Sequence, residues 1–339
     1  MQNRITKSQP LLNDKGGLAN PGYATYPFFV YDRKAIKASV WRIKEWDYYC
    51  TIGDGFGFSC VIADLGYSAM VTATFLDFET GINYKKTKLL WFVFGKMNMP
   101  SSSLEGNVSY HGGGFDFDFV RNDNERLIKI KIKKFHRGTD LICDLKMRDM
   151  KDDSLVIATP WKENPLAFYY NQKINCMPTE GNVVFNGKEY RFFDTKDFSV
   201  LDWGRGVWTY KNTWYWASVS GLADGLRFGL NLGYGFGNTS AATENIIFFD
   251  GVAHKLDQVK FEIQEPDFMK PWRFTDNEGR LEVVMEPLLD RQDTMNLGII
   301  KNLGHQVFGK MSGYFILDDA RKIKFKDVIG FAEKITNHY

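Results

Sequence analysis

Residues 214–236 read WYWASVSGLADGLRFGLNLGYGF, and this stretch decides how the chain folds. From Leu226 onward, bulky residues alternate with arginine, glycine or asparagine, so that every second side chain is large. A period of two is typical of a strand with one bulky face and one small or polar face. The Asp-Gly pair at residues 224–225 favours a tight hairpin turn, because both positions of such a turn need positive φ. The stretch therefore predicts a strand that follows a hairpin turn.

An earlier part of the chain repeats this pattern. Residues 214–216 (WYW) precede residues 230–234 (LNLGY), much as residues 46–49 (WDYY) precede residues 63–67 (ADLGY). Each copy then reaches a turn that ends in glycine, and residues 181–192 (GNVVFNGKEYRF) resemble residues 313–325 (GYFILDDARKIKF). Four matches in the same order indicate an internal duplication. We predict two β-barrel-like halves that join near residues 194–206, with domains over residues 1–200 and 201–339.

Turn and strand signals elsewhere support an all-β chain. Asn186-Gly187 lies between two β-type runs and is the strongest short hairpin signal, and Asp-Gly pairs at residues 54–55 and 250–251 are turn candidates of the same kind. Residues 129–134 alternate lysine with isoleucine, which predicts an edge-like or solvent-facing strand. The best helix candidate covers residues 327–335 (DVIGFAEKI). Many short strands separated by turn signals are typical of barrels or sandwiches.

Composition and charge exclude several classes of protein. The chain has 339 residues with 43 Lys+Arg against 41 Asp+Glu, and 16% of its residues are aromatic. This aromatic content excludes a disordered, low-complexity chain. A formal net charge of +2 lacks the basic excess of a dedicated nucleic-acid binder, so no nucleic-acid partner is expected. No window of 18 apolar residues occurs, so we expect no integral membrane segment.

Cysteine, histidine and glycine patterns indicate neither a metal nor a cofactor. The histidines are not paired at metal-binding spacings, and Gly233-x-Gly235-x-Gly237 lacks the Gly-Lys-Ser/Thr of a phosphate loop. The N-terminal residues contain no apolar signal-peptide core. We therefore expect a cytoplasmic protein whose cysteines are free thiols, because their spacings fit neither a zinc site nor a disulfide framework: Cys50, Cys60, Cys143 and Cys176.

The densest aromatic stretch covers residues 201–216, LDWGRGVWTYKNTWYW. Asp202 and Arg205 lie three residues apart inside it, and burial would force a carboxylate and a guanidinium to pair. Two interpretations follow: a structural ion pair between the halves, or the charged floor of an apolar pocket in which Asp202 holds a raised pKa and donates a proton.

A second polar group lies between two apolar runs. Glu244 and Asn245 come directly before Ile-Ile-Phe-Phe, so alternation places each of them on an apolar face. A carboxylate there needs a salt bridge or a functional role, and Arg227 and Arg205 are the candidate partners. His305 precedes Val-Phe and either faces a cavity or is a hydrogen-bonded group in a loop.

Several long runs together resemble the DUF2804 family over almost the whole chain, from about Gly22 onward. These runs are residues 202–221 (DWGRGVWTYKNTWYWASVSG), 228–245 (FGLNLGYGFGNTSAATEN), 168–175 (FYYNQKIN), 42–49 (RIKEWDYY) and 305–309 (HQVFG). Thr209 departs from the proline that the family pattern leads us to expect, which concerns turn rigidity. The function of the family is uncharacterised, and no family catalytic residues carry over.

The resemblance extends remotely to proteins with two lipocalin-like barrels, such as the AttH and carotenoid 1,2-hydratase group, tocopherol cyclase and fungal Diels–Alderase-type cyclases. It therefore implies two packed calycin-type antiparallel barrels. It also implies an apolar ligand, since those relatives handle polyene or isoprenoid-like molecules in a barrel cavity. Carrying their reactions over would be analogy.

Three functions are compatible with these residues. The first is binding of a lipophilic small molecule in a barrel or inter-barrel cavity, with a lining of Trp203, Trp208, Tyr210, Trp214, Trp216, Asn231, Tyr234 and Asn245. The second is a cofactor-free cyclase, isomerase or hydratase, in which Asp202 or Glu244 is the general acid and Arg205, Tyr234 or His305 its electrostatic partner. The third is an interaction scaffold without a cavity.

Overall fold

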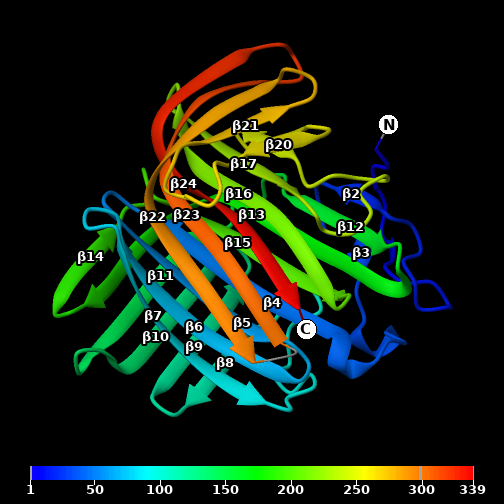
Figure 1. Ribbon diagram of the computed structural model, residues 1–339, viewed down its shortest axis with the longest axis horizontal. Helices are drawn as coiled ribbons and strands as arrows, with labels where there is room; N and C mark the ends of the chain where they lie inside the picture. The colour runs from blue at the N-terminus through cyan, green and yellow to red at the C-terminus, as the bar shows by residue number, and fades with distance from the viewer. Residues whose placement is uncertain (1, 298–299, 339) are drawn as a thin grey trace.

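Two strongly curled antiparallel sheets make up most of the computed structural model, which describes residues 2–297 and 300–338 (Figure 1). In the described part of the chain the first sheet has 13 strands: β2 (Gly22–Ala24), β4 (Ile43–Ile52), β5 (Phe56–Asp64), β6 (Ser68–Asp77), β7 (Ile82–Trp91), β8 (Val108–Gly112), β9 (Phe115–Asn122), β10 (Glu125–His136), β11 (Thr139–Arg148), β12 (Leu155–Trp161), β13 (Asn164–Phe185), β14 (Lys188–Phe192) and β15 (Phe198–Val207).

The second sheet follows in the chain and lies against the first, as the yellow-to-red strands of Figure 1 show. Over the described residues it has nine strands: β16 (Lys211–Ala223), β17 (Leu226–Tyr234), β18 (Ile246–Phe249), β19 (Val252–Lys255), β20 (Val259–Glu262), β21 (Trp272–Asp276), β22 (Leu281–Leu297), β23 (Ile300–Ile316) and β24 (Lys322–His338). The chain passes from one sheet to the other at residues 208–210, a few residues after the predicted boundary at residue 200.

Short elements complete the chain. Strands β1 (Gln9–Pro10) and β3 (Phe29–Val30) form a small parallel pair, and the 3-10 turns η1 (Arg33–Ala35) and η2 (Val40–Arg42) lead into β4. In the described ranges, no helix is long and apolar enough to cross a membrane.

The order of strands within the two sheets supports the duplication. In the first sheet the order β7-β6-β5-β4-β15-β13-β11-β10-β9 places the last strand of the half, β15, beside its first long hairpin strand, β4. The second sheet repeats this with β19-β18-β17-β16-β24-β23-β22-β21-β20, in which β24 lies beside β16. The repeated sequences occupy matching places, since residues 46–49 and 214–216 lie in β4 and β16. An all-β chain with two similar halves is confirmed.

Three of the four predicted hairpin turns have positive φ at both central residues, whereas in the turn between β4 and β5 Gly55 has a φ of 76° but Asp54 does not have positive φ. Asn186 and Gly187 have φ of 49° and 76° and connect β13 to β14, and Asp224 and Gly225 have φ of 52° and 77° between β16 and β17. Asp250-Gly251 connects β18 to β19 in the same way. Positive φ at both central residues suits the right-handed twist of the flanking strands.

The helix predicted for residues 327–335 is wrong, and the prediction for residues 129–134 is confirmed in one of its two alternatives. Residues 327–335 lie in strand β24, not in a helix. Both faces of β24 are covered around Phe331 and Ala332, so its apolar residues run on without a clear period of two. Strand β10 is not at an edge, because it pairs with both β9 and β11. Its lysines Lys129 and Lys131 are nevertheless exposed, as expected for a solvent-facing side.

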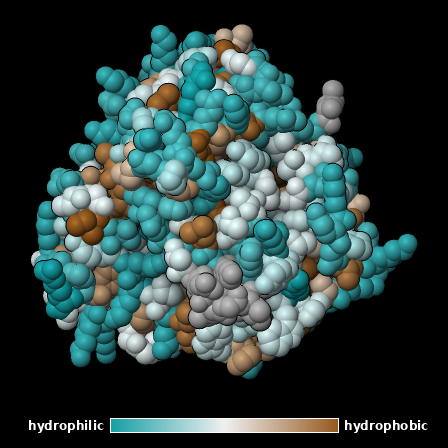
Figure 2. Space-filling model, viewed as in Figure 1, coloured by the Kyte–Doolittle hydropathy of each residue, from teal (hydrophilic) through white to brown (hydrophobic). Residues whose placement is uncertain are grey.

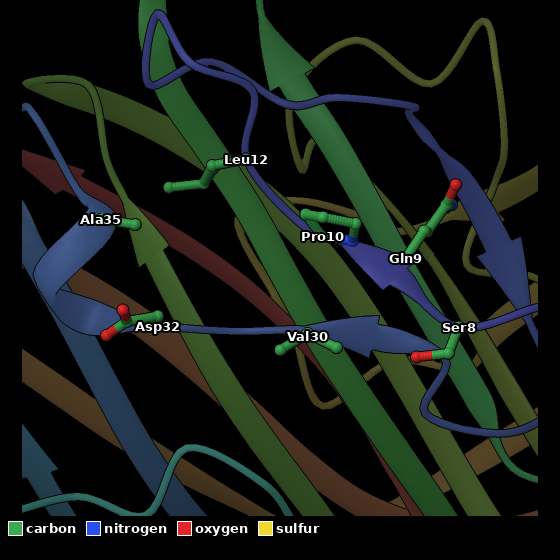
Figure 3. A pocket seen from close by; sticks show the side chains of 7 residues that line it. All are labelled: Ser8, Gln9, Pro10, Leu12, Val30, Asp32 and Ala35. Carbon is green, nitrogen blue, oxygen red and sulfur yellow. The ribbon is translucent and has the colours of Figure 1, made fainter.

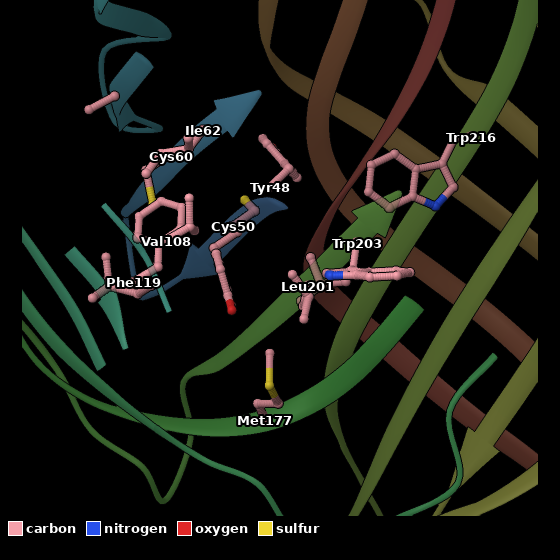
Figure 4. Close-up of a cluster of buried hydrophobic side chains, with 14 of the residues drawn as sticks. Tyr48, Cys50, Cys60, Ile62, Val108, Phe119, Met177, Leu201, Trp203 and Trp216 are labelled. Carbon is pink, nitrogen blue, oxygen red and sulfur yellow. The ribbon is translucent and has the colours of Figure 1, made fainter. Parts of the chain in front are cut away.

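The hydrophobic core lies inside each curled sheet and between the sheets. In the space between them, Tyr48 of β4 meets Trp216 of β16 with ring centroids 6.2 Å apart, and Figure 4 shows both among the buried side chains. The face in Figure 2 is mostly hydrophilic, with hydrophobic residues scattered over it. The aromatic excess of the sequence therefore fills an interior that includes the contact between the sheets.

Candidate functional site

The face of the first sheet that meets the second sheet carries a buried ion pair. Lys173 of β13, Asp202 of β15 and Tyr48 of β4 are direct neighbours in the strand register, so their side chains lie on one face. The Lys173 Nζ lies 2.9 Å from Asp202 Oδ2, and Asn171 Nδ2 donates to Asp202 Oδ1 at 2.6 Å. The side chain of Lys173 is 1% exposed. Its ammonium also lies 3.8 Å from the ring centroid of Trp216, which adds a cation–π contact.

Two carboxyl groups from the second half of the chain complete this site, which we call the inter-sheet cluster: Asn171, Lys173, Asp202, Glu244 and Glu333. Tyr169 donates to Glu244 Oε1 at 2.7 Å, while Glu244 Oε2 has no hydrogen-bond partner among the described residues. Glu333 accepts from Trp214 Nε1 at 2.9 Å and from Gln306 Nε2 at 3.0 Å. Both carboxyl groups belong to buried residues.

Asn231 and Asn245 hold the segment around Glu244 in place. Asn231 Nδ2 donates to the Glu244 carbonyl at 2.7 Å and its Oδ1 accepts from Trp216 Nε1 at 2.7 Å. Asn245 accepts from the Gly233 amide at 2.8 Å and donates to the Asp257 carbonyl at 2.8 Å. These bonds orient residue 244, although it precedes strand β18 and has no ladder partner of its own.

Burial shifts the pKa values of the two glutamates upward. Loss of hydration raises the pKa of Glu244 to about 6 and that of Glu333 to about 7, and in both cases the charge of Lys173 opposes the shift. Asp202 contributes to both shifts in the upward direction, since like charges disfavour a further carboxylate. The cluster therefore contains carboxyl groups that gain or lose a proton near neutral pH.

Aromatic side chains form a wall on one side of the cluster: Trp46, Tyr169, Trp208, Trp214 and Phe236. Tyr169 stacks on Phe236 with centroids 4.7 Å apart, and Trp208 lies 5.8 Å from Trp46 and 5.3 Å from Trp214. Gly204 allows the Trp46 ring to cross strand β15, because a Cβ there would lie 2.0 Å from the indole. Trp46 and Trp214 are only half-buried, so the wall reaches the surface beside Trp208.

The predicted pairing of Asp202 with Arg205 is wrong. The two residues are three apart in β15, and in a strand this places their side chains on opposite faces. Arg205 points into the first half, where its guanidinium lies 2.9 Å from Asp47 Oδ1 and donates to the carbonyls of Pro100, Trp46 and Gly204. The sequence analysis missed this acidic partner and Glu45, although the alternation in residues 43–52 places both on one face of β4.

The partners proposed for Glu244 are also wrong. Arg227 pairs with Asp152 at 2.6 Å, and Arg205 lies on the far face of the first sheet. The Glu244 carboxylate accepts instead from the Tyr169 hydroxyl, and its opposing charge is Lys173. Lys173 was overlooked because a lysine in the run FYYNQKIN looks like a solvent-facing residue, and Glu333 because its segment was predicted to be helical.

The other predicted site residues divide between the cluster and distant places. Trp208, Trp214 and Trp216 adjoin the cluster, as described above. Trp203 lies on the opposite face of β15, with the Arg205 guanidinium 4.0 Å from its ring. The remaining three lie elsewhere: Tyr234 stacks on Tyr215 inside the second half, His305 stacks on Phe268 and contacts Asp290, and Tyr210 is 45% exposed beside His338.

Two surface hollows lie away from the cluster. One of about 320 Å³ is formed by the N-terminal segment and β3, between Gln9, Val30 and Asp32 (Figure 3). The other, of about 390 Å³, lies between the end of β7 and the start of β8, and Lys96 and His111 are among its lining residues. No group of three or more His, Cys, Asp or Glu side chains in the described ranges is placed to hold a metal ion.

The four cysteines are buried, and no disulfide joins them: Cys50, Cys60, Cys143 and Cys176. Burial raises the pKa of each thiol, which keeps them in the less reactive protonated form. The prediction of free, buried thiols is confirmed.

The raised pKa values of Glu244 and Glu333 predict that the fold loses stability as the pH rises. In the unfolded chain both carboxyls ionise near 4.5, whereas in the fold they ionise at about 6 and about 7. Between those pH values the folded state binds more protons, so the free energy of unfolding falls with pH, by an amount on the order of 3–5 kcal/mol, and then levels off. Urea unfolding at about pH 5 and about pH 7.5 measures this fall.

Glu244→Gln and Glu333→Gln are the matched variants, and each should remove part of the fall. Burial lowers the pKa of Lys44 and Lys255 to about 7. These two lysines therefore increase the free energy of unfolding only as the pH rises above about 7. The fall in stability below pH 7 therefore comes from buried carboxyl groups. Burial also raises the pKa of Glu45, Asp47 and Asp197, so the share of Glu244 or Glu333 is the part of the fall that its glutamine variant removes. Stability that is equal at both pH values in the wild type, or a fall that both variants retain in full, would contradict the assignment.

Comparison with known proteins gives a family and a fold. The family described as a domain of unknown function, DUF2804, matches residues 2–339. No curated protein matches. The crystal structure of a protein provisionally named AttH, from Nitrosomonas europaea, is similar with a TM-score of 0.55 and 11% identity, over 91% of this chain and 98% of that chain.

Two further solved structures are similar at equally low identity. CghA with Sch210972 has a TM-score of 0.54 and 12% identity, over 97% of both chains. Kievitone hydratase from Nectria haematococca has a TM-score of 0.49 and 11% identity, over 100% of this chain and 97% of that chain. The likeness to the AttH structure confirms the predicted architecture of two lipocalin-like halves and carries no residue roles.

Proposed function

This chain belongs to the DUF2804 family, a domain of unknown function, and we propose that it binds a small lipophilic molecule at the inter-sheet cluster. The observation that carries the proposal is an unsatisfied polar atom inside an aromatic site. Glu244 Oε2 has no hydrogen-bond partner among the described residues, and Glu244 is 1% exposed. Buried polar atoms nearly always have a partner, so such an atom suits a hydroxyl or a similar donor on a ligand.

The surroundings favour an apolar molecule with one polar end. Trp208, Trp214 and Phe236 provide flat apolar surface beside Glu244 and Lys173. Apolar pockets with a few convergent polar groups are the usual sites for small molecules. The half-buried rings of Trp46 and Trp214 mark the side from which the molecule enters. These rings move aside to admit the apolar part of the molecule.

Catalysis by a carboxylic acid is the second candidate function, and the pKa of Glu244 favours it. A carboxyl with a pKa of about 6 is partly protonated near neutral pH and can give its proton to a double bond of the ligand. The resulting cation loses a proton from a neighbouring carbon, and the Glu244 carboxylate takes that proton back. The net reaction of these steps is an isomerisation. It becomes a cyclisation when a second double bond of the ligand attacks the cation and forms a C–C bond before the proton is lost, and neither reaction consumes an oxidant or a reductant. A dry aromatic site would protect such a cation from water.

A cytoplasmic location is part of the proposal, and the four free thiols support it.

Native mass spectrometry of the protein purified from its own host tests both functions. We expect the wild type to retain a lipophilic molecule, and Trp214→Ala to lose at least about nine-tenths of it, because the wall opens and Glu333 loses a donor. Glu244→Gln keeps the size of the side chain but removes the acidic proton. It should retain the molecule and, if the chain is an enzyme, accumulate it in a form that the wild type converts.

Tyr210→Ala is the control, since Tyr210 is an exposed aromatic away from the cluster, and it should keep the wild-type occupancy. Thermal unfolding of each variant checks that it is folded. A wild type that carries no molecule, or equal occupancy in Trp214→Ala and Tyr210→Ala, would overturn the binding proposal. Identical bound molecules in Glu244→Gln and in the wild type, with no conversion by either, would leave binding alone as the function.

A further inference from the structure

Exposed aromatic side chains gather at one rim of the first sheet, outside the inter-sheet cluster. Trp41 belongs to the turn η2 and is 51% exposed, while Trp91 ends strand β7 and is 51% exposed. Phe92 follows at 62% exposed. With Val40 and Phe94, these residues form what we call the aromatic platform. A cluster of large exposed apolar groups marks a surface that binds another molecule or a membrane.

The platform is one surface, although its residues lie fifty positions apart in the chain. The ring of Trp41 lies 4.9 Å from that of Phe94 and 6.4 Å from that of Phe92. Both segments rest on the same turn. The amides of Phe92 and Phe94 donate to the carbonyls of Tyr67 and Gly66 at 2.6 and 2.8 Å, and a Cβ on Gly66 would lie 3.2 Å from the carbonyl oxygen of Trp41.

Backbone strain holds two of these rings outward. Phe92 and Phe94 have φ of 59° and 46°, a left-handed conformation that is rare for bulky residues. Such conformations persist only where the surroundings impose them, and they concentrate at functional positions. Here the surroundings are polar and buried: Asp64 accepts from the amides of Gly66 and Gly95 at 2.9 and 2.8 Å, and Lys44 donates to the carbonyl of Trp41 at 3.1 Å.

Two basic segments meet beside the platform, because a Cβ on Gly95 would lie 2.7 Å from Arg33 Nε. Residues 33–44 (RKAIKASVWRIK) contain five basic residues and no acidic one, and residues 85–96 (KKTKLLWFVFGK) contain four and none. The whole chain has a net charge of only +2, so this is a local excess. Some of these charges are engaged elsewhere, since Arg33 pairs with Glu45, Lys85 pairs with Asp293 and Lys44 is buried. Lys34, Lys37 and Lys96 are exposed near the aromatic residues in the chain.

We propose that the aromatic platform docks this protein onto the surface of a bilayer that contains anionic lipids. Trp and Phe side chains settle at the boundary between headgroups and acyl chains, and the lysines around them attract acidic headgroups. The same positive rim disfavours a second copy of the chain as the occupant, because pairing two platforms would bring like charges together. This inference goes beyond the ligand site and does not depend on it.

Co-sedimentation of the full-length protein with vesicles tests the proposal. We expect binding to phosphatidylcholine vesicles that contain about one-third phosphatidylserine, weak binding to phosphatidylcholine alone, and loss of binding in high salt. The double variant Trp41→Ser/Phe92→Ser should bind at least about tenfold more weakly, because it removes the inserted rings. Lys34→Glu/Lys96→Glu should weaken binding to anionic vesicles by at least about tenfold and leave the weak binding to neutral vesicles unchanged.

Phe193→Ser/Val252→Ser is the matched control, since these side chains are 51% and 53% exposed on other elements. It should bind like the wild type, and thermal unfolding verifies that all variants fold. Equal binding of the wild type to both kinds of vesicle, or wild-type binding by Trp41→Ser/Phe92→Ser, would overturn the proposal. The proposal would also be overturned if sedimentation velocity showed two copies joined at the platform and the protein did not bind vesicles. None of these variants touches the inter-sheet cluster, so failure here is distinct from failure of the ligand proposal.

Discussion

Lys173→Met is expected to lower the free energy of unfolding by about 3–5 kcal/mol. Lys173 is 1% exposed and faces Asp202 at 2.9 Å. Methionine fills a similar volume but supplies no charge, so Asp202 keeps the Asn171 amide as a donor but loses its opposing charge. An uncompensated buried carboxylate accounts for most of the loss. Because the charge of Lys173 opposes the upward pKa shifts of Glu244 and Glu333, both pKa values should also rise further in the variant.

The double variant Lys173→Met/Asp202→Leu isolates the cause of this loss. It removes both charges, and replacement of a whole buried ion pair by apolar residues is often close to neutral. We therefore expect urea unfolding to show that the double variant recovers most of the stability lost in Lys173→Met. If the double variant is as unstable as the sum of its single changes, packing and not charge explains the role of Lys173.

Arg205→Met should be equally destabilising, by about 3–5 kcal/mol, through a different set of contacts. Arg205 is fully buried, and its guanidinium joins Asp47 to the carbonyls of Pro100, Trp46 and Gly204. Burial already raises the pKa of Asp47, and Arg205 opposes that shift. Without the guanidinium, this carboxylate and several carbonyls lose their donor. Arg205→Lys retains the charge and should recover only part of the loss, because an ammonium lacks the planar fork.

A matched pair elsewhere provides the control. Arg227→Met removes the same kind of side chain from an ion pair with Asp152 at 2.6 Å, but the two side chains are 19% and 27% exposed. A partly solvated pair contributes about 1 kcal/mol or less. Limited proteolysis adds a local readout, since loss of the bonds to Pro100 should expose residues 96–104 to cleavage in Arg205→Met alone. Equal stability of Arg205→Met and Arg227→Met would contradict the assignment.

Local patterns in the sequence were sufficient to predict many of the strands and turns of the fold. The alternation in residues 226–236 and the turn residues Asn186-Gly187 describe neighbours in the chain, and the strands and turns follow from steric rules that act over a few residues. The duplication was also visible, because the two halves keep similar residues at matching places. The helix expected at residues 327–335 failed where a strand is covered on both faces, since burial by distant elements removes the alternation.

The candidate site depended on contacts between distant residues. The aromatic concentration around residues 201–216 does indicate the junction of the two halves, and Trp208, Trp214 and Trp216 lie there. The charged partners were assigned incorrectly because closeness in the chain was taken for closeness in space. Asp202 and Arg205 point away from each other, and their partners Lys173 and Asp47 come from neighbouring strands.

By itself, then, the sequence determined the all-β class, the two similar halves and the region where they meet. Tertiary structure alone decided which buried charge faces which. The physical reason is that a strand sends successive side chains to opposite faces, so register and sheet packing select the partner of each group. Lys173, Asp202, Glu244 and Glu333 come together only when the first sheet presents one face to the second.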